Sequence, residues 1–252
     1  MKKFGVFAAC TWAAFFFWTF PCVSCLADSV HAKERLSSFT TYFNVNDGGR
    51  CENIALAAAR IDGIALQPYG EFSFNAVVGA RTKENGFMQA KIISQGEFVL
   101  GVGGGVCQVS TTLYNAALLS GLSVIEQHPH SLSVAYVSPS RDAMVSSASD
   151  LKLYNPFDET VYFSVKAREG ALTVTVRGKR TNYTYEIESK TLASLPPLPP
   201  METGDEKAVR EGKDGLKSEA YLKTYQNGVL IEVKRLRTDV YAPMRGKIYK
   251  QP

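Results

Sequence analysis

The stretch GVGGGVCQVSTTLYNAALLSGL, residues 101–122, decides how this chain folds. Three consecutive glycines, Gly103, Gly104 and Gly105, lead into a cysteine, Cys107, and the residues after it are apolar at helical spacing on two faces. A helix that is apolar on more than one face is buried in the protein. The stretch therefore predicts a central helix that begins at Cys107 and stops at Gly121.

The position of Cys107 favours a reactive thiol. In the first turn of a helix the unpaired N–H groups and the helix dipole stabilise negative charge, which lowers the pKa of a thiol. The N–H groups of Cys107 and Gln108 are candidate donors to an oxyanion, and the neighbouring glycines leave room for a substrate. The same stretch lacks the third glycine of a dinucleotide-binding loop, at Val106, and the Gly-Lys-Ser/Thr of a phosphate loop. The sequence therefore predicts no cofactor.

A thiol nucleophile needs a base, and the base needs a group that orients it. Apart from His31 near the amino terminus, the histidines are His128 and His130 in EQHPHS. Asp142 and Asp150 follow in later segments and are the candidate orienting groups. The order Cys, His, Asp is similar to that of papain-like and transglutaminase-like thiol enzymes.

Each of these residues also has a structural interpretation. Cys107 can be a small buried residue or the partner of Cys51 in a disulfide, and the two histidines can be polar groups on a strand edge. Asp142 can be a turn residue paired with Arg141, and Asp150 a strand cap. Two histidines and a cysteine lack a further ligand at zinc-like spacing, so no metal site is predicted.

The rest of the main domain is rich in strand patterns. Residues 51–64 predict a helix ending at Gly63, residues 68–79 a turn followed by a strand, and residues 90–101 a hairpin-like pair. Further strands are predicted at residues 38–45, 122–128, 132–137, 150–155, 161–167, 171–178 and 183–189. The last three alternate as half-exposed antiparallel strands do. The predicted fold class is α+β, with the central helix packed on a mainly antiparallel sheet in a papain- or transglutaminase-like arrangement.

Two segments flank this main domain, which is assigned to residues 36–190. Residues 1–27 have the layout of a signal peptide, with two lysines, an apolar run and small residues before a possible cut. The alternative is an uncleaved anchor, because the run is long enough to span a bilayer. The chain is therefore expected to be exported to the periplasm or cell surface, and to touch the membrane only through this segment. Residues 191–203 predict a Pro-rich linker, and residues 204–252 a short β-rich extension with a hairpin turn at Asn227–Gly228.

Net charge limits the classes of binding partner, and cysteine content bears on the state of Cys107. The chain carries a net charge of +4 without a basic stripe, so nucleic acid is excluded as a partner. Export would leave Cys51 and Cys107 as the remaining cysteines, and a disulfide between them is the plainest alternative to a catalytic thiol.

Several stretches together resemble the VanW family, which is named for an accessory protein of B-type vancomycin resistance clusters. They are GGGVCQVSTTLYNAALLSGL, HPHS, YVSPSRDAMV and DLKLYNP, and the resemblance covers about residues 38–178. Members are typically exported or membrane-anchored bacterial proteins, so the resemblance implies a cell-wall setting without an established reaction. The C-terminal extension is similar to the small β modules that often follow VanW domains.

The resemblance also implies site residues. The family pattern falls on Gly103, Gly104, Gly105, Cys107, Gln108, Ser110, Thr111, Thr112, Tyr114, Asn115, His130, Asp142 and Asp150. It favours His130 over His128 as the base. It weakens a family-wide disulfide, because Cys51 stands where other residue types are expected.

The sequence thus predicts an envelope protein with a cysteine hydrolase or transpeptidase-like site that acts on a peptide or amide of peptidoglycan. Cys107 is the predicted nucleophile, His130 the base, and Asp142 or Asp150 the orienting group. The predicted substrate-binding residues are Gly103, Gly104, Gly105, Gln108, Thr111, Tyr114 and His128. The alternative is a non-catalytic scaffold or wall-binding protein that holds wall peptide or glycan with the glycine loop and the aromatic residues Tyr114, Tyr136, Phe72 and Phe74.

Overall fold

The computed structural model describes residues 34–94 and 96–250. The predicted signal segment and His31 lie outside these residues. Within the described part of the chain, no helix is both long and apolar enough to cross a membrane.

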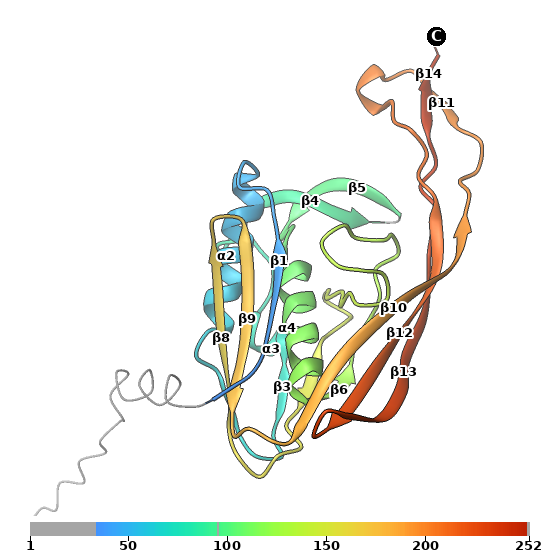
Figure 1. The fold of residues 1–252 in the computed structure, drawn as a ribbon. Coiled ribbons are helices and arrows are strands. Elements are labelled where there is room, and N and C mark those ends of the chain that lie inside the picture. Colours follow the sequence, from blue (N-terminus) through green and yellow to red (C-terminus); the bar gives the residue numbers. More distant parts are fainter. Residues whose placement is uncertain (1–33, 95, 251–252) are drawn as a thin grey trace, which may run out of the picture.

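Helix α4 (Val106–Ser120) lies at the centre of the main domain (Figure 1). Thirteen of its 15 residues are buried, which is why it packs against other elements on several sides. Gly121 ends it with a left-handed conformation, at φ 84°, as the sequence predicts.

A four-stranded antiparallel sheet covers one side of α4. Its order is β1 (Glu34–Tyr42), β9 (Ala171–Gly178), β8 (Val161–Arg168) and β2 (Ala65–Leu66). Strand β9 alternates buried and half-exposed residues along its length, as the sequence pattern predicts. Helix α2 (Gly48–Ile61) packs on β8 and against α4, so the two helices share one face of the sheet.

Shorter elements complete the main domain around α4. A small sheet has the order β3 (Glu71–Ser73), β7 (Lys152–Tyr154) and β6 (Ser123–Glu126). Strands β4 (Gln89–Ser94) and β5 (Glu97–Val102) form the predicted hairpin. This hairpin leads directly into the glycine loop and α4.

Two strand predictions in this region are wrong in part. The strand expected within residues 68–79 ends at Ser73, whose side chain accepts a hydrogen bond from the Ala76 N–H and caps the short helix α3 (Phe74–Val78). Residues 132–137 form no strand. Leu132 is buried, but no neighbouring strand pairs with this segment, which instead lines a cavity near Cys107.

The C-terminal residues form a second antiparallel sheet with the order β10 (Tyr183–Leu195), β12 (Gly215–Gln226) and β13 (Val229–Tyr241). Asn227 and Gly228 have φ values of 50° and 82°, which makes the predicted tight hairpin turn. The sheet runs along α4 and extends beyond the main domain toward the C terminus (Figure 1). There β11 (Met201–Thr203) pairs in parallel with β14 (Lys247–Tyr249), beside the short 3-10 helix η1 (Glu206–Ala208).

The observed fold is therefore a mixed α and β fold with mostly antiparallel strands and a central helix that begins next to Cys107. A papain- or transglutaminase-like topology is not confirmed by this arrangement. Strand β10 includes the first residues of the predicted linker 191–203, and residues 196–200 have no regular structure.

Candidate functional site

The glycine loop brings the start of α4 close to two other elements. Gly105 is the N-cap of α4 and has φ 108°, a conformation that disfavours a side chain. A Cβ on Gly104 would lie 2.5 Å from the Lys91 carbonyl oxygen, and the Asn53 amide of α2 donates to the Gly104 carbonyl at 2.9 Å. Gly104 and Gly105 are buried. These two glycines therefore allow close packing of the loop against β4 and α2, and together with Gly103 they line the cavity beside Cys107.

Cys107, His130 and Asp142 are brought together at this end of α4. The Asp142 carboxylate oxygen Oδ2 accepts a hydrogen bond from His130 Nδ1 at 2.6 Å and another from the His130 backbone N–H at 2.7 Å. The Cys107 thiol donates to the Val145 carbonyl at 3.4 Å. It lies close enough to the His130 ring for each group to shift the pKa of the other. Since Nδ1 is held by Asp142, Nε2 is the ring nitrogen available to the sulfur.

The charges of this group reinforce one another. Burial raises the pKa of the Cys107 thiol, but the hydrogen bond and charge of His130, together with the charge of Arg81, lower that pKa below its ordinary value. Burial lowers the pKa of His130, but its bonds to Asp142 and Cys107 raise that pKa to about 9. Both directions favour a thiolate–imidazolium pair near neutral pH.

Asp142 is the carboxylate that binds the His130 ring. Its side chain is 1% exposed, and burial raises its pKa, but His130, Arg237 and Tyr241 lower that pKa overall. Arg141 donates to the Asn115 side chain, so the local Asp142–Arg141 pair considered from the sequence is not what holds Asp142.

Asp150 has a different task. Its carboxylate accepts from the Ser73 hydroxyl at 2.5 Å and from the backbone N–H groups of Asn75 and Leu151 at 2.9 and 2.8 Å. The Asn75 side chain in turn accepts from Arg81 Nη1 at 2.7 Å. Asp150 therefore orders the segment that presents Arg81 near Cys107, and does not contact His130.

Cys107 and His130 line a cavity of about 850 Å³. One wall is the β4–β5 hairpin, where Ile92 and Phe98 give it an apolar character, and Tyr136 stands on another wall. Four cationic side chains also line it, and no acidic residue does so within the described part of the chain. The cations are Arg50, Arg81, Lys91 and Lys213. The cavity thus combines a thiol, apolar surface and positive charge.

Gln108 lines the cavity, whereas Thr111 does not, and both side chains are buried and hydrogen-bonded to neighbouring segments. The Gln108 amide accepts from Arg50 Nη2 at 2.6 Å and donates to the Thr41 hydroxyl and the Tyr42 carbonyl. The Gln108 backbone N–H donates to the Gly105 carbonyl at 2.9 Å, so this expected oxyanion donor is already used. The Thr111 hydroxyl is buried and accepts from the Ala143 N–H at 2.9 Å.

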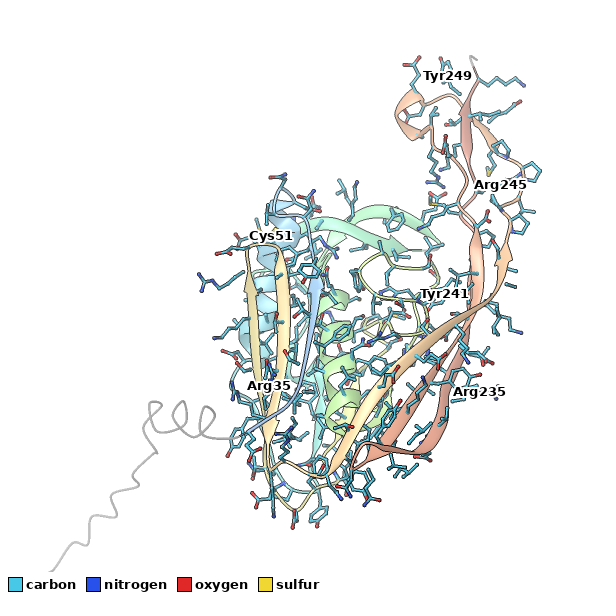
Figure 2. The ribbon with its side chains drawn as sticks, in the orientation of Figure 1. Arg35, Cys51, Arg235, Tyr241, Arg245 and Tyr249 are labelled. Carbon is cyan, nitrogen blue, oxygen red and sulfur yellow. The ribbon has the colours of Figure 1, made fainter. Side chains whose placement is uncertain are left out.

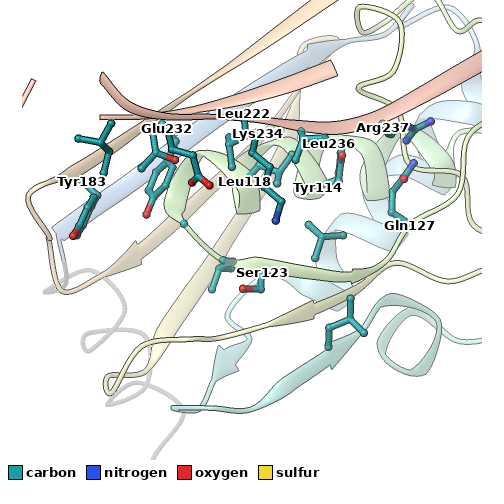
Figure 3. Close-up of a pocket in the computed structure, with 17 residues that line it drawn as sticks. Tyr114, Leu118, Ser123, Gln127, Tyr183, Leu222, Glu232, Lys234, Leu236 and Arg237 are labelled. Atoms are coloured by element: carbon teal, nitrogen blue, oxygen red, sulfur yellow. The ribbon is translucent and has the colours of Figure 1, made fainter. Parts of the chain in front are cut away.

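Tyr114 and His128 are not brought to Cys107. Tyr114 lines a separate cavity of about 610 Å³ between α4, β6 and the C-terminal sheet (Figure 3). The His128 ring contacts Glu126 at 2.9 Å. Of the other aromatic residues considered from the sequence, Phe72 and Phe74 belong to the hydrophobic core.

Cys51 and Cys107 are both free thiols in the structure. The Cys51 thiol, at the start of α2, donates to the Asn44 carbonyl at 3.4 Å (Figure 2). Over residues 34–94 and 96–250, no group of three or more His, Cys, Asp or Glu side chains has an arrangement that could hold a metal ion.

The sequence did not indicate three residues that act on Cys107 or Asp142, namely Arg81, Arg237 and Tyr241. Arg237 donates to the Asp142 carbonyl at 2.8 Å, and the Tyr241 hydroxyl donates to the Asp142 carboxylate. These two residues are 95 and 99 positions away from Asp142 in the chain. No local pattern in the sequence marks contacts of that separation.

Comparison with family models gives two matches. Residues 49–177 match the model described as VanW like protein, and residues 199–251 match the G5 domain. The resemblances drawn from the sequence, to a VanW domain and a following β module, are thereby confirmed. VanW and G5 domains together associate the chain with the extracytoplasmic cell envelope.

Two curated proteins are similar to the main domain. "Uncharacterized protein YoaR" of Bacillus subtilis is 38% identical over 167 residues, which are 66% of this chain and 53% of that protein. "Vancomycin B-type resistance protein VanW" of Enterococcus faecalis is 30% identical over 78 residues, which are 31% of this chain and 28% of that protein. The chain thus spans about half the length of the first relative and under a third of the second.

Two solved G5 structures match the chain weakly. The G5 domain of HP0197 matches 28% of this chain and 99% of its own, with 17% identity and a TM-score of 0.17. The IgA1 protease G5 domain matches 29% of this chain and 95% of its own, with 18% identity and a TM-score of 0.18.

Proposed function

Because the chain belongs to the VanW family, and the matched segment contains Cys107, His130 and Asp142, we propose that it is a cell-envelope thiol enzyme. It would hydrolyse a peptide or amide, or transfer its acyl group to an amine. The observation that carries the proposal is that the Cys107 thiol and the His130 ring line one cavity, with the ring held by a hydrogen bond to the Asp142 carboxylate.

The reaction follows from this order. The Cys107 thiolate attacks the carbonyl carbon and forms a C–S bond, and the carbonyl oxygen takes the negative charge. Collapse of this intermediate breaks the C–N bond, and the imidazolium of His130 gives its proton to the leaving amine. His130 then takes a proton from water or from a second amine, which attacks the thioester and releases Cys107.

Two groups assist these steps. The carboxylate of Asp142 keeps the His130 ring in one orientation and stabilises its charged form. The Cys107 backbone N–H lies in the first turn of α4, and no acceptor for it is found within the described residues. It is therefore the oxyanion donor we propose, aided by the positive end of the helix dipole.

The cavity favours an anionic substrate. Its four cations and lack of described acidic residues attract a carboxylate, while the hairpin wall accommodates an apolar stem. Peptides of peptidoglycan lie in the envelope and carry carboxylates, so they are the substrate class that we propose.

The test compares two cysteine variants of the chain on purified peptidoglycan fragments, with products identified by mass spectrometry. Cys107→Ala is expected to abolish cleavage and transfer. Cys51→Ala, which removes the other described thiol, is expected to retain both. Equal product formation by Cys107→Ala and the unchanged chain would refute the proposal.

A second candidate is a non-catalytic wall-binding protein, which the G5 match favours. Strand β13 adds an observation, since Val229, Leu230, Ile231 and Val233 are exposed on it. Binding to insoluble wall that survives Cys107→Ala, combined with a Cys107 thiol no more reactive than Cys51, would support this alternative.

A further inference from the structure

The loop of residues 138–142, which ends at Asp142, is held by all three strands of the C-terminal sheet. From β10, the Ser189 hydroxyl donates to the Pro139 carbonyl at 2.6 Å. From β12, the Ser218 hydroxyl lies 2.7 Å from that of Ser140. From β13, the Tyr241 hydroxyl accepts from the Ser140 N–H at 2.7 Å. The sheet is thus bound to this loop at three places.

The two carboxylate oxygens of Asp142 have separate partners. Oδ2 accepts both hydrogen bonds from His130. Oδ1 accepts from the Tyr241 hydroxyl and lies 3.5 Å from Arg237 Nη2. Arg237 Nη1 also donates to the Asp142 backbone carbonyl at 2.8 Å. Donors on Oδ1 fix the plane of the carboxylate and so direct Oδ2 at the imidazole.

Both donors, Tyr241 and Arg237, are little exposed to solvent and are held in place by their neighbours. Tyr241 is 1% exposed, and the Arg237 side chain is 10% exposed. Arg237 is itself held by Asp239 on the same strand, through Nε at 2.5 Å. Figure 2 shows Tyr241 where the C-terminal sheet passes the loops beside α4.

We infer that Tyr241 and Arg237 are positioning residues for the Cys107–His130–Asp142 group, and that the C-terminal sheet is therefore part of the site. The inference rests on the proposed function for its catalytic meaning. The VanW match, residues 49–177, contains Cys107, His130 and Asp142, whereas the G5 match, residues 199–251, contains Arg237 and Tyr241. The positioning residues and the group that they hold therefore lie in different matched segments. A ligand that displaced β13 would release Asp142 and disorient His130.

Loss of the Tyr241 hydroxyl would weaken the chain of interactions from Asp142 through His130 to Cys107. Asp142 would keep a buried oxygen with one donor fewer, so its charged form would be less stable. A less firmly held carboxylate stabilises the His130 imidazolium less, and the Cys107 thiolate loses part of its counter-charge. Arg81, whose charge also lowers the pKa of Cys107, is held by Asn75 rather than by Tyr241 and keeps its position. Tyr136 faces the same cavity, and its pKa is raised by burial and by the charges of Cys107 and Asp142.

The experiment measures the pH dependence of Cys107 alkylation by iodoacetamide, with the modified cysteine identified by peptide mass analysis. Tyr241→Phe keeps the ring and is expected to move the alkylation midpoint upward, with about a three- to tenfold slower reaction at mildly acidic pH. Tyr225→Phe is the matched control, because it removes a tyrosine hydroxyl of the same sheet that bonds to Glu186 at 2.8 Å. It is expected to leave the midpoint unchanged.

A double variant separates positioning from general stability. In an Asp142→Asn background, Tyr241→Phe is expected to add no further shift of the midpoint, because it acts through the Asp142 carboxylate. An unchanged midpoint in Tyr241→Phe, or an equal shift with and without Asp142, would overturn the inference. If Tyr241→Phe does not fold, Arg237→Lys keeps the charge, removes the paired bonds to Asp142, and is expected to raise the midpoint.

This assay uses no substrate, so its outcome is independent of the proposed reaction. A raised midpoint in Tyr241→Phe together with a chain inactive on peptidoglycan would support the positioning role and count against the proposed function. An unchanged midpoint in Tyr241→Phe together with a chain active on peptidoglycan would support the proposed function and count against the positioning role.

Discussion

Cys107 is partly buried and His130 is buried, yet each favours the charged form of the other. Burial by itself disfavours both the thiolate and the imidazolium. His130 is nevertheless the main stabiliser of the thiolate, and the imidazolium is stabilised by Asp142 and then by Cys107. The reactivity of the thiol is therefore a property of the group, and single substitutions should reveal it.

Replacing the imidazole is the first test at this scale. His130→Gln is expected to raise the pKa of Cys107, because burial then acts without its main opposing interaction. Alkylation of Cys107 at neutral pH should slow at least about tenfold, since one pKa unit changes the thiolate fraction by that factor. Cys51 in the same chain is the internal control. Equal slowing of both thiols would contradict the prediction.

In the unchanged chain the pair has a defined pH window. The thiolate–imidazolium pair forms as pH rises above the lowered pKa of Cys107. It is lost as pH rises through the pKa of His130, at about 9, where the ring gives up its proton. Catalysis that needs His130 as the acid should therefore decline above that value.

Asp142 gives a second prediction, on stability. Its folded-state pKa is below the ordinary value, so its charged form stabilises the fold above the unfolded-state pKa, and this contribution is lost as pH falls through the lower folded-state pKa. Asp142→Asn is expected to reduce the free energy of unfolding by about 1–3 kcal/mol near neutral pH. Urea denaturation followed by circular dichroism at several pH values measures it. A difference from the unchanged chain that does not shrink in acid would contradict the assignment.

At the scale of elements, the cavity is built where the β4–β5 hairpin, the glycine loop and the irregular segment 132–137 meet the start of α4. The helix and the hairpin were predictable, because periodicity and turn residues are local properties of the sequence. The irregular segment was not, because its alternating pattern is that of a strand and its lack of a pairing partner is a tertiary property. The sequence therefore predicted the helix that carries Cys107 and the hairpin beside it, but not the full shape of the cavity wall.

The charge of this cavity leads to a third prediction. Iodoacetate and iodoacetamide alkylate the same sulfur, but the first is an anion. The ratio of their rates is expected to be higher at Cys107 than at Cys51, because Arg81 and Lys91 attract the anion. Arg81→Gln is expected to lower this ratio at Cys107 about two- to tenfold and leave Cys51 unchanged.

The outcome should also depend on ionic strength. Added salt screens exposed charges and is expected to reduce the preference for iodoacetate. A ratio at Cys107 equal to that at Cys51 at low salt would argue against an anionic substrate.

At the scale of the whole molecule, the main domain and the C-terminal sheet are joined by strand β10 and by side-chain contacts. The sequence indicated a boundary in the Pro-rich stretch after residue 190, where composition changes abruptly. In the structure β10 crosses that position and continues into the second sheet. A proline-rich composition reports local stiffness, whereas the joining contacts involve side chains far apart in the chain. For this reason the sequence named Cys107, His130 and Asp142 as candidates, which the structure brings together, but gave no sign of Arg237 and Tyr241.

The joint between the two parts can be tested at the end of α4. Gly121 has φ 84°, and a Cβ there would lie 2.6 Å from the hydroxyl oxygen of Tyr185 on β10. Gly63 follows α2 with φ 81°, and a Cβ at Gly63 would have no neighbour within 4 Å. Both glycines have the same backbone requirement, but only Gly121 faces the C-terminal sheet.

Gly121→Ala and Gly63→Ala therefore form a matched pair. Each is expected to lower the free energy of unfolding by about 1 kcal/mol for the left-handed backbone. Gly121→Ala should cost more, because Tyr185 and β10 must also move, and it should raise the alkylation midpoint of Cys107 by loosening the sheet that holds Asp142. Urea denaturation and the pH dependence of alkylation measure the two effects. Equal losses of stability with an unchanged midpoint would mean that the sheet is attached to the main domain without supporting its site.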